Sequence, residues 1–198
     1  MLRSTTQPST HLFVNCCTRL CRGRIEPAPL PVACSHLPDA APILQLTLVR
    51  FLERNCMNGA RVFFDTNVLL YMYGGADSAK QKRAMELFRQ SARHGQMLVS
   101  TQVVQEFYAA GSRKLKMPRR ELREVVAALL ECPLVTVGPE EITAAIHTED
   151  RYGISFWDAL ILAAAESGGA ELVYTEDLND GQEYGAVTVR NPFRLPPE

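Results

Sequence analysis

The sequence is short of the residues that disulfide frameworks and zinc sites require. Five of its six cysteines lie before residue 57, and Cys132 alone lies after it. Cys17 and Cys21 could begin a zinc site, but no second pair of Cys or His follows at finger-like spacing. A reduced, cytosolic protein is therefore the simpler interpretation. No apolar run reaches the length of a membrane span, which argues against an integral membrane protein.

A strong net charge is also absent, because the 198 residues sum to −1. The balance is uneven, since residues 1–56 carry +3 and residues 57–198 carry −4. A nucleic-acid-binding protein needs only a local basic strip against phosphate, so this total does not exclude that class. An acidic domain also fits a site that collects carboxylates around a metal ion.

Residues 1–56 lack sustained helical or strand periodicity, and only 43–52 could form one short element. Prolines at positions 27, 29, 31, 38 and 42 interrupt the segment. The first 25 residues hold four arginines and no acid, which loosely fits a transit peptide. The first strong strand signal follows Met57, so we favour Met57 as the true start. Whichever start is used, we expect residues 1–56 to be a mostly disordered extension and 57–198 to form the folded domain.

From Arg61 onward, short apolar segments alternate with helical patterns. The predicted strands are 62–64, 97–99, 134–137, 172–174 and 186–189. The predicted helices are 66–73, 78–94, 101–110, 118–132, 139–152 and 156–167, with Ser78, Thr101 and Ser155 as expected N-caps. This alternation predicts an α/β fold with a mainly parallel sheet covered on both faces. Ligands of such sheets bind beyond the carboxyl ends of the strands.

Three acids occupy informative places relative to these elements. Asp65 directly follows the first strand, where it could equally cap the next helix. Glu106 lies at the edge of an apolar helix face, with Gln102 one turn earlier, and could be a solvated flank residue. Asp177 follows the strand 172–174, where an ordinary turn acid is the simple alternative.

Asp158 is the sharpest case, because it interrupts the helix FWDALILAAAES. That helix is apolar on nearly every side, which predicts burial. An unpaired buried charge costs several kcal/mol. Ser155-x-x-Asp158 also fits a capping box, which explains the spacing but not an acid at the head of a buried helix.

The joint pattern of the four acids is stronger than each member. A parallel sheet would gather them along one edge, where they repel one another unless a cation is present. An all-oxygen set suits Mg²⁺ or Mn²⁺, and the lack of His and Cys in it disfavours zinc.

Five segments in order resemble PIN-domain proteins, especially VapC-like toxins of bacterial toxin–antitoxin pairs. They are FFDTNVLLY (63–71), STQVVQEF (100–107), SFWDALILAAA (155–165), LVYTEDLNDGQ (172–182) and VRNPF (189–193). The resemblance implies a three-layer α/β/α sandwich and Mg²⁺- or Mn²⁺-dependent hydrolysis of RNA. It implies that the metal ligands are Asp65, Glu106, Asp158 and Asp177, supported by Asn67 and Thr175. It also implies an antitoxin that covers the site, and a homodimer.

Two further features concern the RNA. The dense basic run of Arg113, Lys114, Lys116, Arg119 and Arg120 closely follows the Glu106 helix, where it could bind phosphate or form a solvated face. Phe156 and Trp157 could stack a base, but we expect core packing instead.

Other functions fit less well. A haloacid-dehalogenase-like phosphatase needs a second Asp where Asn67 stands. A receiver domain requires a Lys after a late strand, where this chain has Thr175, Glu176 and Asp177. The open alternative to a nuclease is a non-catalytic PIN module that binds RNA or protein.

Overall fold

The computed structural model describes residues 59–74 and 77–194. Three expectations from the sequence lie outside the described residues. They are the disordered extension, the start at Met57, and those that concern the cysteines before residue 57. None of the described helices is long and apolar enough to cross a membrane.

A six-stranded sheet forms the centre of the fold, in the order β3-β2-β1-β4-β6-β5. All neighbouring pairs are parallel except β5 with β6. The strands are β1 (Arg61–Phe64), β2 (Met97–Ser100), β3 (Leu134–Val135), β4 (Ala170–Tyr174), β5 (Glu183–Tyr184) and β6 (Val187–Arg190). The prediction of a mainly parallel sheet is confirmed. Helical crossovers between parallel strands place helices on its faces.

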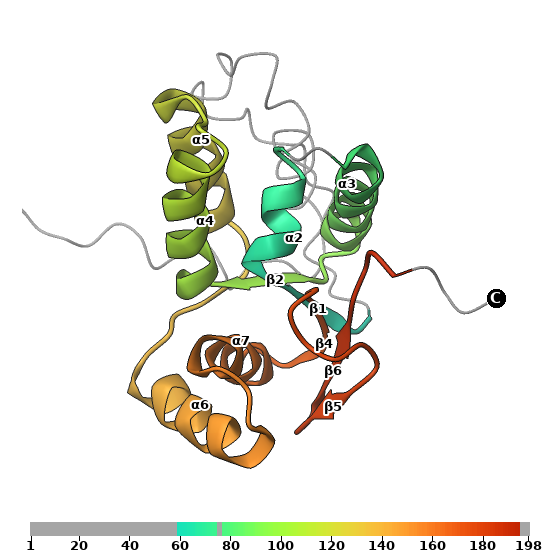
Figure 1. Cartoon of the computed structure of the whole chain (residues 1–198), viewed down its shortest axis with the longest axis vertical. Coiled ribbons are helices and arrows are strands. Elements are labelled where there is room, and N and C mark those ends of the chain that lie inside the picture. Colours follow the sequence, from blue (N-terminus) through green and yellow to red (C-terminus); the bar gives the residue numbers. More distant parts are fainter. Residues whose placement is uncertain (1–58, 75–76, 195–198) are drawn as a thin grey trace, which may run out of the picture. The chain divides into compact units, whose positions relative to one another are not determined.

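Helices cover both faces of this sheet, which gives three layers (Figure 1). One layer holds α2 (Thr66–Tyr71), α3 (Ser78–Arg93), α4 (Thr101–Arg113) and α5 (Arg119–Leu130). The other layer holds α6 (Pro139–Tyr152) and α7 (Phe156–Ser167). The predicted α/β/α sandwich is therefore confirmed.

The core lies between the sheet and its helices. Its largest fully buried side chains are aromatic and come from both strands and helices: Phe63, Phe64, Phe88 and Phe107. A second small cluster joins α6 to α7 through Ala145, Ala159, Leu160 and Ala163. Seven consecutive residues of α7, 159–165, are buried, as its sequence predicted. This burial fixes the first turn of α7, which carries Asp158.

Two predicted N-caps are wrong by one residue. Asp77 caps α3, because its carboxylate accepts hydrogen bonds from the backbone of Ala79 and Lys80. Ser100 caps α4, because its hydroxyl accepts from Val103 N. Thr101 Oγ1 instead accepts from Val137 N at 3.0 Å. That bond replaces strand pairing, so β3 is shorter than predicted.

Other element bounds also differ from the prediction, and α2 ends at Tyr71 instead of Tyr73. Helix α4 continues past Ala110 to Arg113, because Gly111 allows close packing on α5; a Cβ on this glycine would lie 2.7 Å from Leu122 Cδ1. The two-residue strand β5 was not predicted. It forms an antiparallel hairpin with β6, and so short a pairing leaves no alternating pattern to detect.

Candidate active site at the carboxyl ends of the strands

The pairing of β1 with β4 places Asp65 beside Thr175. Phe64 pairs with Tyr174, so the next residue of each strand emerges at the same sheet edge. The backbone N–H of Asp65 continues the ladder by donating to the carbonyl of Tyr174 at 3.1 Å. The sequence expectation that acids gather at the strand ends thus has a direct basis in the register.

The buried carboxylate of Asp65 accepts three hydrogen bonds from different kinds of donor. The backbone N–H of Thr66 donates to Oδ1, which makes Asp65 the N-cap of α2. Asn67 Nδ2 and Thr175 Oγ1 donate to Oδ2, at 2.8 Å and 2.7 Å. Asp65 therefore caps α2 and also contacts two side chains at the sheet edge, Asn67 and Thr175.

Bridging donors connect Asp65 to Glu106 and to Asp177. Thr66 Oγ1 donates to Glu106 Oε2 at 2.7 Å. Thr66 therefore contacts Asp65 through its backbone N–H and Glu106 through its side chain. Asn67 Nδ2 lies 2.9 Å from Asp177 Oδ2. Thr175 Oγ1 accepts from Asp177 N at 3.1 Å. Asp65, Glu106 and Asp177 thus belong to one network centred on the start of α2.

Asp158 reaches the site from the first turn of α7. Ser155 Oγ accepts from Asp158 N at 3.2 Å, which confirms Ser155 as the N-cap. The Asp158 carboxylate accepts from the Ser155 hydroxyl at 2.7 Å, whereas in the predicted capping box it would accept from the Ser155 backbone N–H. Asp158 itself is half-buried. Gln102 Nε2 donates to Glu106 Oε1 at 2.9 Å and to the carbonyl of Trp157 at 3.3 Å, and so ties α4 to the start of α7.

The four acids line one open cavity of about 500 Å³. Its other polar and charged lining residues are Thr66, Asn67, Gln102, Arg113 and Lys114, and its apolar ones include Leu70, Ala109, Ala110, Trp157 and Ile161. With four carboxylates against two cationic side chains, the lining carries a formal charge of −2 when all groups are ionised. Such a cavity favours cations over free anions.

Burial raises the pKa of Asp65 from 3.8 to about 7. The hydrogen bonds from Thr175 and Thr66 oppose this shift, while the negative charges of Asp177 and Glu106 add to it. A carboxylate that holds its proton near neutral pH, in a cluster of like charges, is a common mark of a functional site. A cation beside Asp65 would lower that pKa again.

The donor set fits a hydrated divalent cation. All four acids offer oxygen, and two amide oxygens of lining residues, Asn67 Oδ1 and Gln102 Oε1, are buried without a hydrogen-bond partner. Among residues 59–74 and 77–194, no three Asp, Glu, His or Cys side chains are grouped closely enough to ligate one ion together. Mg²⁺ commonly takes one or two carboxylates and keeps several waters, for which the free amide oxygens are suitable acceptors.

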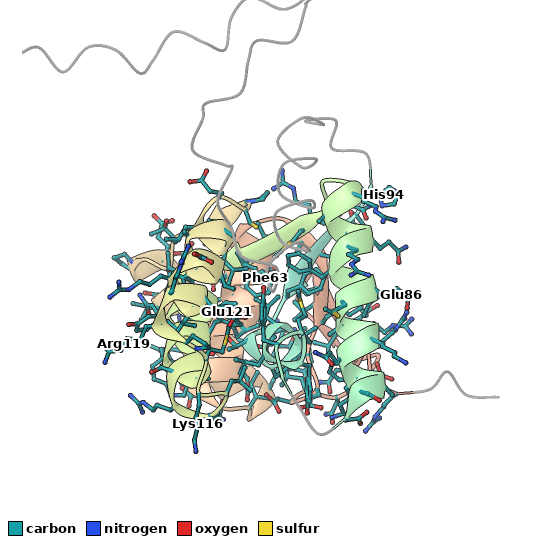
Figure 2. All side chains as sticks on the ribbon, turned by 90° about the horizontal axis from the view of Figure 1, so that it is seen from above. Phe63, Glu86, His94, Lys116, Arg119 and Glu121 are labelled. Carbon is teal, nitrogen blue, oxygen red and sulfur yellow. The ribbon has the colours of Figure 1, made fainter. Side chains whose placement is uncertain are left out.

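The basic run divides between the cavity and the outer surface. Arg113 and Lys114 line the cavity, whereas Lys116, Arg119 and Arg120 are not among its lining residues. Arg120 pairs with Glu124 on its own helix at 3.0 Å. Figure 2 shows Lys116 and Arg119 at the outer margin of the α4–α5 pair. Only the first two cations therefore lie beside the acids.

The expectation that Trp157 packs in the core is wrong. Its side chain is 62% exposed and lines the cavity, whereas Phe156 is partly buried against the α6–α7 cluster. Consecutive residues at a helix start point in different directions, so only one of the two can face the core.

Sequence reasoning also missed the roles of Thr66 and Gln102. Thr66 bridges Asp65 and Glu106, and Gln102 holds both Glu106 and the Trp157 carbonyl. The spacing of Gln102 one turn before Glu106 was the available signal for the second role. Thr66 gave none, because its contact with Glu106 spans 40 positions.

Comparisons with known proteins bear on the fold and the family. The sequence pattern of the PIN domain matches residues 62–180. A search among curated proteins finds no match.

A structure described as a toxin–antitoxin complex from Klebsiella pneumoniae is similar with a TM-score of 0.52 and 20% identity, over 68% of this chain and 99% of that chain. DNA-bound VapBC from Salmonella typhimurium is similar with a TM-score of 0.51 and 18% identity, over 67% and 98%. At these identities the two structures support the fold. The match to the domain pattern covers more than half of the sequence, and the chain belongs to the PIN domain family.

Proposed function

We propose that this protein is a ribonuclease that hydrolyses phosphodiester bonds of RNA with the help of Mg²⁺ or Mn²⁺. The observation that carries the proposal is the shared cavity of Asp65, Glu106, Asp158 and Asp177, which come from four separate places in the sequence. Membership of the PIN domain family supports a nuclease as the general class. The unpaired amide oxygens and the negative lining support a cation there.

Asp65 and Asp158 are proposed as the main ligands of the ion, with Glu106 and Asp177 completing the site. A divalent ion would supply a more acidic bound water and would stabilise charge on the phosphate oxygens. Within the described residues, no hydrogen bond engages Asp158 Oδ1 or Asp177 Oδ1. These two oxygens are therefore free to accept from water, and we propose that Asp177 orients an attacking water molecule.

The remaining side chains hold the acids in place and receive the substrate. Thr66 and Gln102 fix both oxygens of Glu106, and Asn67 and Thr175 fix Asp65. Arg113 and Lys114 are placed to bind RNA phosphates and offset the repulsion from the acids. Lys116, Arg119 and Arg120 would extend this contact along the outer surface.

The biological setting is also a proposal. The two similar structures are described as a toxin–antitoxin complex and as VapBC, which supports a toxin whose partner is an antitoxin. We propose a cytoplasmic homodimer that is blocked when this antitoxin covers the acid cavity. We further propose that residues 57–198 form the nuclease domain, which predicts that this fragment cleaves as the full chain does.

A non-catalytic PIN module that binds RNA or protein is the second candidate. The observation that favours it is the lack, in the described residues, of three potential metal-ligand side chains grouped around one point. A binding module would need the basic side chains and not the acids. The two candidates therefore differ in their response to loss of a single carboxylate.

The test is cleavage of total RNA by the full chain with Mg²⁺, Mn²⁺ or EDTA, in wild type, Asp158→Asn and Asp150→Asn. Asp150 is an exposed acid of α6 outside the cavity lining and is the matched control. The nuclease predicts discrete, metal-dependent fragments that fall at least about 100-fold in Asp158→Asn and persist in Asp150→Asn. Undiminished cleavage by Asp158→Asn contradicts the assignment. A folded protein that neither cleaves RNA nor binds metal in calorimetry supports the binding module.

A further inference from the structure

The indole of Trp157 stands at the edge of the acid cavity with 62% of its surface exposed. It is the single tryptophan of the sequence. Large aromatic side chains contribute most of their stabilisation when buried, and this one is left open beside a polar cavity. The other strongly exposed apolar side chains, on α4, α5 and α6, are not among the residues that line this cavity. Trp157 therefore contributes an accessible aromatic surface to the site.

The surrounding contacts hold this residue in a defined place. Its ring meets the Phe156 ring edge-on, with centroids 5.4 Å apart and planes at 71°. Phe156 in turn packs on the α6–α7 cluster. The Trp157 carbonyl accepts from Gln102 Nε2, which also holds Glu106. Trp157 is thus connected to Glu106 through one buried side chain and precedes Asp158 in the chain.

The cavity therefore combines three kinds of group that contact a nucleotide in different ways. The acids are suited to a cation, and Arg113 and Lys114 are suited to phosphate. The exposed indole is suited to the flat face of a base. A base offers that face only when it is unstacked, as in loops, bulges and single strands, and a continuous duplex hides it.

We propose that Trp157 stacks on the base next to the scissile phosphate and thereby positions the RNA in the cavity. This inference rests on the proposed nuclease function. Stacking would position the phosphate relative to the acids, since the indole is fixed to the helix that carries Asp158. Every base has such a face, so Trp157 does not select a particular base.

The single tryptophan allows a direct test by intrinsic fluorescence. The full chain is titrated with a short single-stranded RNA, with the same strand carrying an abasic position, and with the matching duplex. Titrations use EDTA at low salt, and are repeated with Mg²⁺ on an Asp177→Asn background in which the RNA stays intact. We expect the single strand to quench the fluorescence and to bind about 5- to 100-fold more tightly than the abasic strand or the duplex.

Binding of fluorescently labelled RNA to variants completes the test. Trp157→Ala should lose this preference for bases, Trp157→Phe should keep part of it, and Tyr108→Ala should match wild type. Tyr108 is an exposed aromatic of α4 outside the cavity lining and serves as the control. The proposal is overturned if intact and abasic strands bind equally in both conditions, or if Trp157→Ala binds as wild type does. The exposed indole would then serve another role, such as a contact with a protein.

Cleavage assays distinguish failure of the stacking proposal from failure of the nuclease. If wild type cleaves and Trp157→Ala cleaves with an unchanged KM, the nuclease stands and stacking is excluded. If wild type does not cleave but a base quenches Trp157, stacking stands and the protein is a binding module. We expect Trp157→Ala to raise KM by about tenfold with a smaller change in kcat, because substrate positioning is lost while the acids are intact.

Discussion

Lys80 Nζ lies 2.6 Å from Glu176 Oε2, and this ion pair connects α3 to the residue that precedes Asp177. Tyr71 completes a triangle: its hydroxyl accepts from Lys80 at 2.9 Å and donates to Glu176 Oε1 at 2.8 Å. The hydrogen bonds to Glu176 and Tyr71 raise the pKa of Lys80, which keeps it charged. The turn that carries Asp177 is thus held from outside the cavity.

Loss of that ion pair should impair catalysis more than stability. The pair is partly exposed, so Lys80→Met should cost about 1 kcal/mol or less of unfolding free energy. Freeing the Asp177 turn should lower the cleavage rate several-fold. Rates and thermal unfolding should be compared with Lys82→Met, an exposed lysine of α3 outside the triangle. A rate for Lys80→Met equal to that of the control would show that the triangle does not position Asp177.

The raised pKa of Asp65 predicts that the metal-free protein loses stability as pH rises from about 4 to about 7. The folded state keeps the proton up to a pKa of about 7, whereas the unfolded chain releases it near 3.8. In that window the folded state binds more protons, so unfolding free energy falls with pH, by up to about 4 kcal/mol.

Asp65→Asn removes that titration, so the variant should match wild type near pH 4 and be more stable near pH 8. Chemical unfolding in EDTA at several pH values measures both curves. Saturating Mg²⁺ should narrow the difference in unfolding free energy at pH 8, because the ion binds more tightly to wild type, which has all four carboxylates, than to the variant. A wild-type curve flat between pH 4 and pH 8 would show that Asp65 ionises normally.

Thr175→Val should weaken the network around Asp65 while keeping the shape of the side chain. The variant removes one donor to Asp65 and one acceptor for Asp177 N, in a residue that is 1% exposed. We expect a loss of about 1–3 kcal/mol in urea unfolding, because buried polar partners are left unsatisfied. Thr175→Ser keeps the hydroxyl and should lose less than half as much. Similar losses in both variants would attribute the effect to the methyl group.

Charge reversal at the cavity should change the salt dependence of RNA binding. Arg113→Glu and Lys114→Glu should each weaken binding to all sequences and reduce the slope of log K against log salt by about 0.7 per lost phosphate contact. Lys82→Glu supplies the same change of charge on α3. The same reversal at Arg119 tests whether the outer part of the basic run also contacts RNA. Unaltered slopes at Arg113 and Lys114 would exclude them from the phosphate path.

The sequence predicted the architecture because strands and helices differ in period and length, as the segments around Phe63 and Leu162 show. It predicted that the four acids come together, because Asp65 and Asp177 follow strands, Asp158 begins an apolar helix and Glu106 lies at the edge of an apolar helix face. The role of Thr66 was missed because its contact with Glu106 spans 40 positions. The role of Gln102 was missed because its bond to the Trp157 carbonyl is also long-range, although its spacing from Glu106 was a local signal. Trp157 was misjudged because an aromatic residue in an apolar helix resembles core until the direction of its side chain is known.

The bond between Asp65 and Thr175 joins residues 110 positions apart, and Thr175 N in turn donates to the carbonyl of Arg190 in the last strand of the sheet. During synthesis the first of these residues leaves the ribosome long before the last. The acid cavity therefore cannot be assembled while the chain is still growing through β4. An enzyme that cuts RNA would then acquire its activity only after β6 has been synthesised, and the messenger and ribosome that produce it would not be exposed to that activity earlier.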